Sequence, residues 1–178
     1  MREAAAISDV LIRQAGPSDV EAIAEAHRDS IQTIGPDFYA RPDVDAWQEG
    51  LSGDVYLRAM DRGEVFFIAS GHVGGTGVVL GFSSDYVIGG GTHGTSVYVR
   101  GMAARRGIGT ALLRRAEAHG AARGAMRVEI EASLAGVEFY KANRYIEVRT
   151  VDTRLRSGRT IACVVMRKDL ARTNPEIV

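Results

Sequence analysis

Residues 99–113, VRGMAARRGIGTALL, join a predicted strand over 95–99 to a predicted helix over 110–120 through a turn that contains Gly107 and Gly109. The N-terminus of a helix carries backbone N–H groups without intrahelical acceptors, and the helix dipole favours a negative charge there. Glycine lets a ligand approach such a backbone closely because it has no Cβ. The stretch therefore predicts a phosphate-binding turn that opens a helix.

Apolar residues at helical spacing support the helix after the turn: Ile108, Ala111, Leu112 and Ala116. Five arginines and no acidic residue lie between residues 97 and 116, in a chain whose formal net charge is zero. This local positive charge suits a phosphorylated ligand. An ordinary strand–helix turn followed by a solvated basic helix is the structural alternative.

The rest of the chain predicts a single domain, 1–178, of mixed helices and strands. Its 178 residues are 46% hydrophobic and 25% charged, which is typical of a folded domain. The first helix is predicted to begin at Ser18 as N-cap and to run for about 13 residues. Further helices are predicted over 44–49, 54–61 and 136–142. A strand is predicted over 10–14, and three more are predicted to form a meander over 64–70, 77–88 and 95–99. A further strand is predicted over 127–132, and a hairpin follows over 145–154 and 160–167. A frayed tail is expected from residue 171.

Composition and spacing exclude several functional classes. A single cysteine excludes a disulfide framework, and four histidines without paired spacing predict no metal site. No long apolar run is present, so no membrane contact is expected, and net neutrality argues against nucleic acid as a partner. Gly89, Gly91 and Gly94 match the dinucleotide pattern G-x-G-x-x-G but lead into a strand, and no G-K-[ST] triplet occurs. Without a secretory signal, a cytoplasmic location is expected.

Two motifs carry a resemblance to a known family. Residues 99–113 resemble the acyl-CoA-binding motif of the GNAT superfamily of N-acetyltransferases, Q/R-x-x-G-x-G/A, which aligns with residues 104–109. The segment FYKANRY at 139–145 is similar to a second family segment, F-Y-x-x-x-G-F/Y. Two positions depart from the family pattern, since Ala104 replaces the usual Gln or Arg and Arg144 replaces a glycine.

The resemblance covers about residues 10–168 and implies a fold. It implies an α+β, three-layer architecture, in which helices flank a mixed, mostly antiparallel sheet of six to seven strands with splayed central strands. It also implies an enzyme that uses acetyl-CoA as donor and moves the acetyl group directly onto an amine. The backbone of Val97 and Val99 is then expected to bind the pantetheine arm, and a backbone N–H near Val99 or Arg100 to stabilise the oxyanion. The pyrophosphate is expected to lie on Arg105, Arg106, Gly107, Ile108, Gly109 and Thr110.

The resemblance suggests catalytic residues as well. Tyr140 matches the usual tyrosine of the family and is predicted to protonate the leaving thiolate, with a packed aromatic as the alternative. His93 lies about where many relatives carry a glutamate and is the first candidate for the base that deprotonates the amine. A surface loop histidine is the alternative. Glu129 and Glu131 are further candidates, unless they form an ion-paired strand face. Cys163 is not expected to act as a nucleophile.

The acceptor pocket is expected beside the first helices, with Phe38, Tyr39 and Trp47 as candidate binding residues and core packing as the alternative. The glycine-rich turn at 89–94 is expected to border the same cleft. The acceptor is predicted to be a small-molecule amine with a hydrophobic portion. A catalytically silent acyl-CoA-binding domain, suggested by Ala104 and Arg144, and a protein or peptide N-acetyltransferase are the alternatives. Because many relatives dimerise, a homodimer is the expected oligomer.

Overall fold

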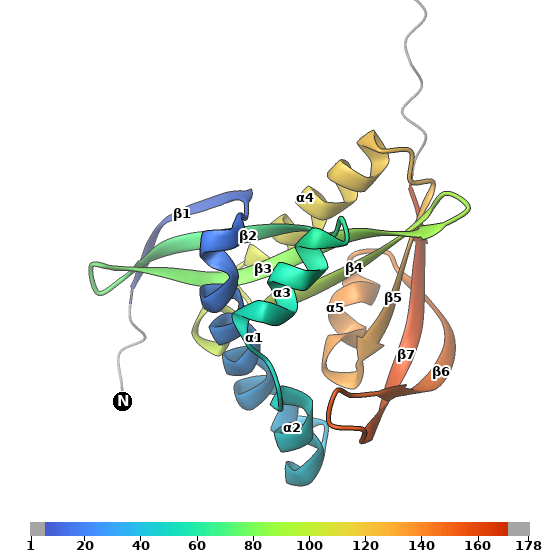
Figure 1. The fold of residues 1–178 in the computed structure, drawn as a ribbon, viewed down its shortest axis with the longest axis horizontal. Helices are drawn as coiled ribbons and strands as arrows, with labels where there is room; N and C mark the ends of the chain where they lie inside the picture. Colours follow the sequence, from blue (N-terminus) through green and yellow to red (C-terminus); the bar gives the residue numbers. More distant parts are fainter. Residues whose placement is uncertain (1–5, 171–178) are drawn as a thin grey trace, which may run out of the picture.

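A computed structural model describes residues 6–170, so the tail predicted from residue 171 lies outside the described residues. The centre of the molecule is a seven-stranded sheet with the order β1-β2-β3-β4-β5-β7-β6 (Figure 1). Its strands are β1 (Ile7–Gln14), β2 (Val65–Val73), β3 (Thr76–Gly89), β4 (Thr92–Val99), β5 (Arg127–Ser133), β6 (Ile146–Arg154) and β7 (Thr160–Asp169). All neighbouring strands pair antiparallel except β4 and β5, which are parallel. The sheet is therefore mixed and mostly antiparallel, as expected.

Helices cover both faces of this sheet and make three layers (Figure 1). One face carries α1 (Val20–Ile34), α2 (Arg41–Gln48) and α3 (Gly53–Asp61), and the other carries α4 (Ile108–Ala122) and α5 (Val137–Ala142). Short 3-10 turns η1 (Pro17–Asp19), η2 (Gly35–Asp37), η3 (Gly101–Ala103) and η4 (Leu134–Gly136) connect them. Within residues 6–170, no helix is both long enough and apolar enough to cross a membrane.

The first helix differs in one detail from the prediction. Ser18 lies inside η1 and makes no capping hydrogen bond, so its predicted N-cap role is wrong. The carboxylate of Asp19 instead accepts the backbone N–H of Gly16 at 2.9 Å and pairs with Arg13 at 2.8 Å. The chain turns tightly at Pro17. Asp19, the third residue of this turn, is therefore the one whose side chain reaches back to the backbone before it.

The parallel pair β4–β5 is short, and this feature makes the site. The pairing joins only residues 92–94 to residues 127–129, after which the two strands diverge. The antiparallel pairing of β4 with β3 continues to Val99, so β4 itself stays straight. A V-shaped opening results between the carboxyl ends of β4 and β5, which confirms the expected splay.

Candidate functional site

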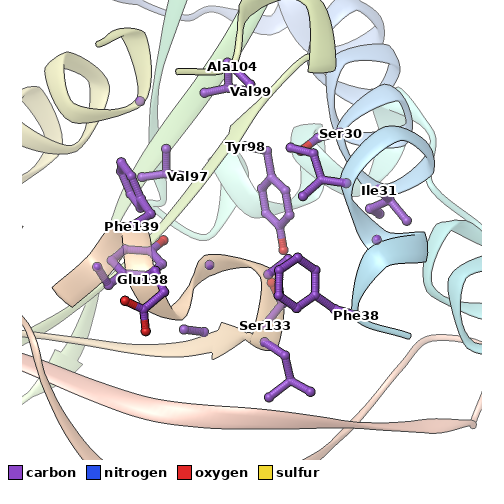
Figure 2. Close-up of a pocket in the computed structure, with 18 of the residues that line it drawn as sticks. Ser30, Ile31, Phe38, Val97, Tyr98, Val99, Ala104, Ser133, Glu138 and Phe139 are labelled. Atoms are coloured by element: carbon purple, nitrogen blue, oxygen red, sulfur yellow. The ribbon is translucent and has the colours of Figure 1, made fainter. Parts of the chain in front are cut away.

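A cavity of about 700 Å³ occupies the V-shaped opening. Its floor is the diverging ends of β4 and β5, and its walls come from α1 and η2 on one side and from α5 on the other (Figure 2). Tyr98 and Phe38 project into its lower half, while Val99 and Ala104 lie at its upper end beside the start of α4. The cavity therefore joins the predicted phosphate turn to the predicted acceptor residues.

The phosphate turn has the conformation that an anion site requires. Gly107 precedes α4 with φ 78°, and a Cβ at this position would meet no other atom within 4 Å, so its backbone faces open space. The first N–H groups of α4 have no intrahelical acceptor, so they are available to a phosphate. Arg105, Gly107, Gly109 and Thr110 line the cavity.

Two residues of the phosphate turn have side chains outside the cavity, and the predicted use of their backbone amides stays a prediction. Ile108 is only 6% exposed because its side chain packs between α4 and the sheet. Arg106 lies in a separate shallow hollow against Ile12 of the edge strand β1. Ile108 is the first residue of α4 and turns towards the sheet, whereas Arg106 precedes the helix in a turn between two residues with positive φ, Arg105 and Gly107.

Gly109 serves packing rather than flexibility. A Cβ here would approach the Phe139 ring at 3.1 Å and the Val99 side chain at 3.5 Å. The first turn of α4 therefore packs directly against both α5 and β4. This close contact fixes the phosphate turn relative to the V-shaped opening.

The edge of β4 that faces the opening carries backbone donors that are not paired with β3. The N–H of Arg100 donates to the carbonyl of Leu80 in β3 at 2.8 Å. Backbone N–H groups alternate in direction along a strand, so those of Val99 and Val97 point away from β3 and into the opening. The N–H of Arg100 is therefore unavailable as an oxyanion donor. The N–H groups of Val97 and Val99 are the ones predicted to bind the pantetheine arm.

Tyr140 reaches the opening from α5. It lines the cavity, and the residue is only 4% exposed. Burial raises the pKa of its phenol, and a hydrogen bond from the backbone of Val97 opposes this effect without cancelling it. The phenol is therefore protonated at neutral pH and has a proton to donate into the cavity.

His93 lies on the opposite face of the sheet from the acceptor end of the cavity. It is only 4% exposed and is absent from the cavity lining, and its Nδ1 lies 2.6 Å from the Asp85 carboxylate. The same carboxylate contacts Nδ1 of His119 on α4 at 2.7 Å. The alternation along β4 explains this position, because His93 shares a face with Val97 and not with Tyr98. His93 thus lies outside the cavity lining, and its role as the base stays a prediction.

The glycine-rich turn does not border the cavity either. It joins β3 to β4 at the far end of β4, where the carbonyl of Gly91 accepts the backbone N–H of Met126 at 2.8 Å. The V-shaped opening lies at the other end of the strand, so the two features are separated by the length of β4.

The predicted acceptor residues divide into two groups. Phe38 and Trp47 line the cavity, as expected for a pocket wall. Tyr39 does not line it and packs edge to face on Trp47 with ring centroids 5.6 Å apart. The structure adds lining residues that the sequence did not indicate, among them Ser30 and Ser133. Of the two candidate glutamates, Glu131 lines the cavity and Glu129 does not.

The described residues offer no alternative chemistry based on a protein metal site. Within residues 6–170, no three His, Cys, Asp or Glu side chains gather as metal ligands would. Cys163 is a buried free thiol, and burial raises its pKa. It packs in the core formed by α1, α2 and the β6–β7 hairpin.

Comparisons with known proteins agree with this geometry. A GCN5-related N-acetyltransferase from Rhodopseudomonas palustris is similar in structure, with a TM-score of 0.76, 25% identity, and coverage of 93% of this chain and 98% of that one. An N-acetyltransferase from Thermoplasma acidophilum, solved in complex with coenzyme A, has a TM-score of 0.69 and 19% identity over 92% of this chain and 100% of that one. A phosphinothricin acetyltransferase from Sinorhizobium meliloti, solved with acetyl-CoA, has a TM-score of 0.68 and 18% identity over 94% of this chain and 91% of that one.

Sequence comparison identifies the family directly. No curated protein sequence matches the chain. The sequence model of the acetyltransferase (GNAT) family matches residues 26–143, which include the phosphate turn and Tyr140. The chain therefore belongs to the GNAT acetyltransferase family.

Proposed function

We propose that this acetyltransferase transfers the acetyl group of acetyl-CoA to the amino group of a small molecule. Acetyl-CoA as donor follows from membership of the family. The nature of the acceptor is inferred from the acceptor end of the cavity. The observation that carries the proposal is a pair of contacts that join the α1–α2 connection to the β6–β7 hairpin.

The first of these contacts is made by Tyr39. Its hydroxyl donates to the carbonyl of Ala162 in β7 at 2.7 Å and accepts the backbone N–H of Leu134 in η4 at 2.7 Å. The phenol thus uses both its donor and its acceptor capacity to connect three segments. Burial raises its pKa to about 12, so the hydroxyl stays protonated and both hydrogen bonds persist at neutral pH.

The second contact is an ion pair between Asp43 of α2 and Arg159 beside the start of β7. Beneath it, apolar residues fill the space between α2 and the hairpin: Val44, Trp47, Ile161, Cys163 and Leu155. An extended peptide needs an open groove along which its backbone finds hydrogen-bond partners. The two contacts and this packed core close that side of the cavity, which favours a compact acceptor.

The remaining surface of the acceptor end indicates the character of the acceptor. Ile31, Ile34, Phe38 and Trp47 make it largely apolar, and Glu131 also lines the cavity, with its carboxylate accepting the hydroxyl of Thr153 at 2.8 Å. A small amine with an apolar portion fits such a lining, because the wall desolvates its carbon skeleton.

The donor end fits acetyl-CoA on the geometry of the chain itself. The open backbone at Gly107 and the free N–H groups of α4 suit the pyrophosphate, with Arg105 as a neighbouring cation. The inward N–H groups of Val97 and Val99 suit the amide-bearing pantetheine arm. When bound, acetyl-CoA supplies a thioester whose acetyl carbon is the electrophile. Ala104 lines the cavity without a polar side chain, so the backbone provides most of this recognition.

An acceptor panel tests the proposal. Purified protein with acetyl-CoA is assayed for thiol release with small primary amines, amino acids and short peptides. We expect turnover with apolar small amines and little with peptides. Donor binding measured by calorimetry without turnover on any acceptor would favour the silent domain, and turnover confined to peptides would favour a peptide acetyltransferase.

A variant of the closing contact sharpens this test. Tyr39→Phe removes both hydrogen bonds of the hydroxyl and keeps the ring. We expect peptide turnover to increase relative to turnover of the small amine, since the loosened connection admits a longer acceptor. An unchanged ratio would show that these hydrogen bonds do not limit acceptor size.

A further inference from the structure

Two hydroxyl groups at the acceptor end of the cavity have no hydrogen-bond partner in the part of the chain that the structure describes. They belong to Ser30 of α1 and Tyr98 of β4, and both residues line the cavity. The carbonyl of Ser30 accepts the Thr33 hydroxyl at 3.4 Å, but the Ser30 hydroxyl itself makes no hydrogen bond. Neither hydroxyl is sealed inside the protein, because Nε2 of His27 is the one fully buried side-chain atom without a partner among residues 6–170. Both hydroxyls are therefore open to a ligand in the cavity.

Neighbouring rings hold the Tyr98 side chain in place. Its ring centroid lies 3.7 Å from that of His27 on α1 and 5.5 Å from that of Phe82 on β3. Trp47 of α2 approaches it edge to face at 6.3 Å. The hydroxyl points into the lower half of the cavity, where Phe38 lies (Figure 2). A ring held from three elements does not turn to find another partner, so its hydroxyl is preorganised for a ligand.

Ser30 is buried and still unpartnered. It follows His27 by three residues on the same face of α1 and is only 7% exposed. A hydroxyl inside a helix can donate to the carbonyl four residues before it, as Thr33 does to Asp29 at 2.7 Å. Ser30 makes no such bond. A buried hydroxyl without a partner is unfavourable, so a ligand that supplies the partner is bound more tightly.

The charges around the cavity are acidic outside the phosphate turn. Asp37, Glu131 and Glu138 line it, and the one cationic lining residue is Arg105, which precedes α4. Lys141, outside the lining, pairs with Glu138 at 3.2 Å. An anionic group on the acceptor would therefore meet carboxylates and no cation at this end, whereas an ammonium group is attracted.

The Tyr98 phenol can donate as well as accept. Burial, and after it the neighbouring Cys163 thiol, raise its pKa, and the positive charge of Arg156 in the β6–β7 turn opposes this increase without cancelling it. The phenol is therefore protonated at neutral pH. Arg156 does not line the cavity, so it offers no direct contact to a carboxylate on the acceptor.

We propose that the acceptor amine carries an uncharged hydrogen-bonding group and no carboxylate or phosphate, and that the hydroxyls of Tyr98 and Ser30 bind the uncharged group. An apolar amino alcohol has this chemistry. The inference rests on the proposed transfer to a small amine and narrows its substrate class. Tyr98 and Ser30 are then specificity-determining residues, because they contact a part of the acceptor that does not react.

Acceptors built on one carbon skeleton test the substrate class. Phenylalaninol, phenylalanine and phenethylamine share a ring and an amine, and they differ in carrying a hydroxyl, a carboxylate or neither. Leucinol, leucine and isopentylamine repeat the comparison on a smaller skeleton. In the set that the wild type acetylates faster, kcat/KM for the amino alcohol should exceed that for the plain amine about tenfold. It should exceed that for the amino acid at least about hundredfold. Equal values for the amino acid and its amino alcohol would overturn the proposal.

Tyr98→Phe separates recognition from packing. The change removes the hydroxyl and leaves the ring stacked on Phe82. We expect KM for the amino alcohol to rise about tenfold with little change in kcat, while KM for the plain amine stays the same. A packing defect would raise both KM values by the same factor. Tyr86→Phe is the matched control, since it removes the same group from a residue that does not line the cavity, and its constants should equal those of the wild type.

Ser30→Ala provides a second, independent variant. It should also reduce the preference for the amino alcohol over the plain amine, with KM for acetyl-CoA unchanged. Its melting temperature should not fall, because the change breaks no hydrogen bond within the protein. If Tyr98→Phe and Ser30→Ala both keep the wild-type preference, the two hydroxyls do not bind the acceptor and the proposal fails.

The outcomes separate this inference from the proposed function. Faster turnover of amino acids than of amino alcohols would leave acetylation of a small amine intact and exclude the substrate class inferred from the hydroxyls. A protein that acetylates peptides alone would contradict both.

Discussion

At the scale of single residues, the site depends on where buried polar groups find partners. Tyr140 and Tyr39 are both partly or fully buried phenols, but their surroundings differ. Tyr39 has a carbonyl acceptor and an N–H donor in fixed positions, so its role is to hold segments together. Tyr140 lines the cavity with its proton uncommitted to a protein carbonyl, so we propose that it donates to a ligand.

Tyr140→Phe tests this donor role. The change removes the hydroxyl and leaves the ring packed against Tyr145 and Phe139. We expect kcat to fall at least tenfold, about the lower limit of a general-acid contribution, because the thiolate must leave unprotonated. Affinity for coenzyme A, measured by calorimetry, should stay nearly unchanged. Turnover equal to that of the wild type would remove Tyr140 as the acid.

At the scale of elements, the departure at Arg144 has a structural explanation. Arg144 follows α5 with φ 71°, in the left-handed region that favours glycine. The N–H of Tyr145 bonds to the carbonyl of Tyr140, and that of Arg144 bonds to the carbonyl of Lys141, which together form a Schellman cap. The backbone therefore keeps the glycine conformation of the family with an arginine in place, and the cost is conformational strain.

Replacement of this residue measures the strain. Arg144→Gly should raise the free energy of unfolding by about 1 kcal/mol, because glycine adopts the left-handed conformation without a steric penalty. Chemical denaturation monitored by circular dichroism gives the difference. Arg144→Ala is the control, since it removes the same side chain but keeps a Cβ, and it should not stabilise the protein. A similar gain from both variants would assign the effect to the charge.

The elements themselves were largely predictable from the sequence, because periodicity and turn residues are local signals. The phosphate turn, α4, the meander and the final hairpin all lie close to their predicted ranges. The face on which a side chain lies was less predictable. The side chain of His93 shares a face of β4 with Val97, and the sequence of one strand does not show which face meets the acceptor. The contacts of Tyr39 with Ala162 join residues 123 positions apart, and no local pattern contains them.

The contact between Ser84 and Ser96 illustrates the same limit. The two residues come from neighbouring strands, and each is an ordinary strand residue in its own segment. Only the register of β3 and β4 brings them together. The sequence therefore predicted the donor end of the site, which one continuous segment builds, far better than the acceptor end, which six separate elements build.

At the scale of the whole molecule, the two helical layers meet the ligand from opposite sides of the opening. The proposed donor site is lined by residues of α4, α5 and β4, and these elements contribute to two of the three core clusters. A ligand that binds only the native state stabilises it against unfolding. Donor binding should thus be visible in global stability.

Thermal unfolding checks this coupling. Acetyl-CoA at a concentration one hundred times its Kd should stabilise the fold by about 2.7 kcal/mol. For a domain of this size the melting temperature should increase by about 5–10 °C. Differential scanning fluorimetry measures the shift. Pantetheine, which lacks the pyrophosphate, should produce a smaller increase in melting temperature. Equal shifts for both ligands would contradict the phosphate role of the turn before α4.

The three-residue pairing of β4 with β5 has one more consequence. The inward amides of Val97 and Val99 have no strand partner across the opening, whereas the amides of Gly94 and of the residues before it lie inside the paired part of the sheet. Amide protons without a partner exchange rapidly with deuterium, and those held in hydrogen bonds exchange slowly. One strand should therefore show both behaviours: the amides of Ser96, Tyr98 and Arg100, which point to β3, should stay protected, whereas that of Val99 should exchange rapidly and become protected when the donor binds. Exchange along β4 would report occupancy of the donor site residue by residue, without an acceptor present.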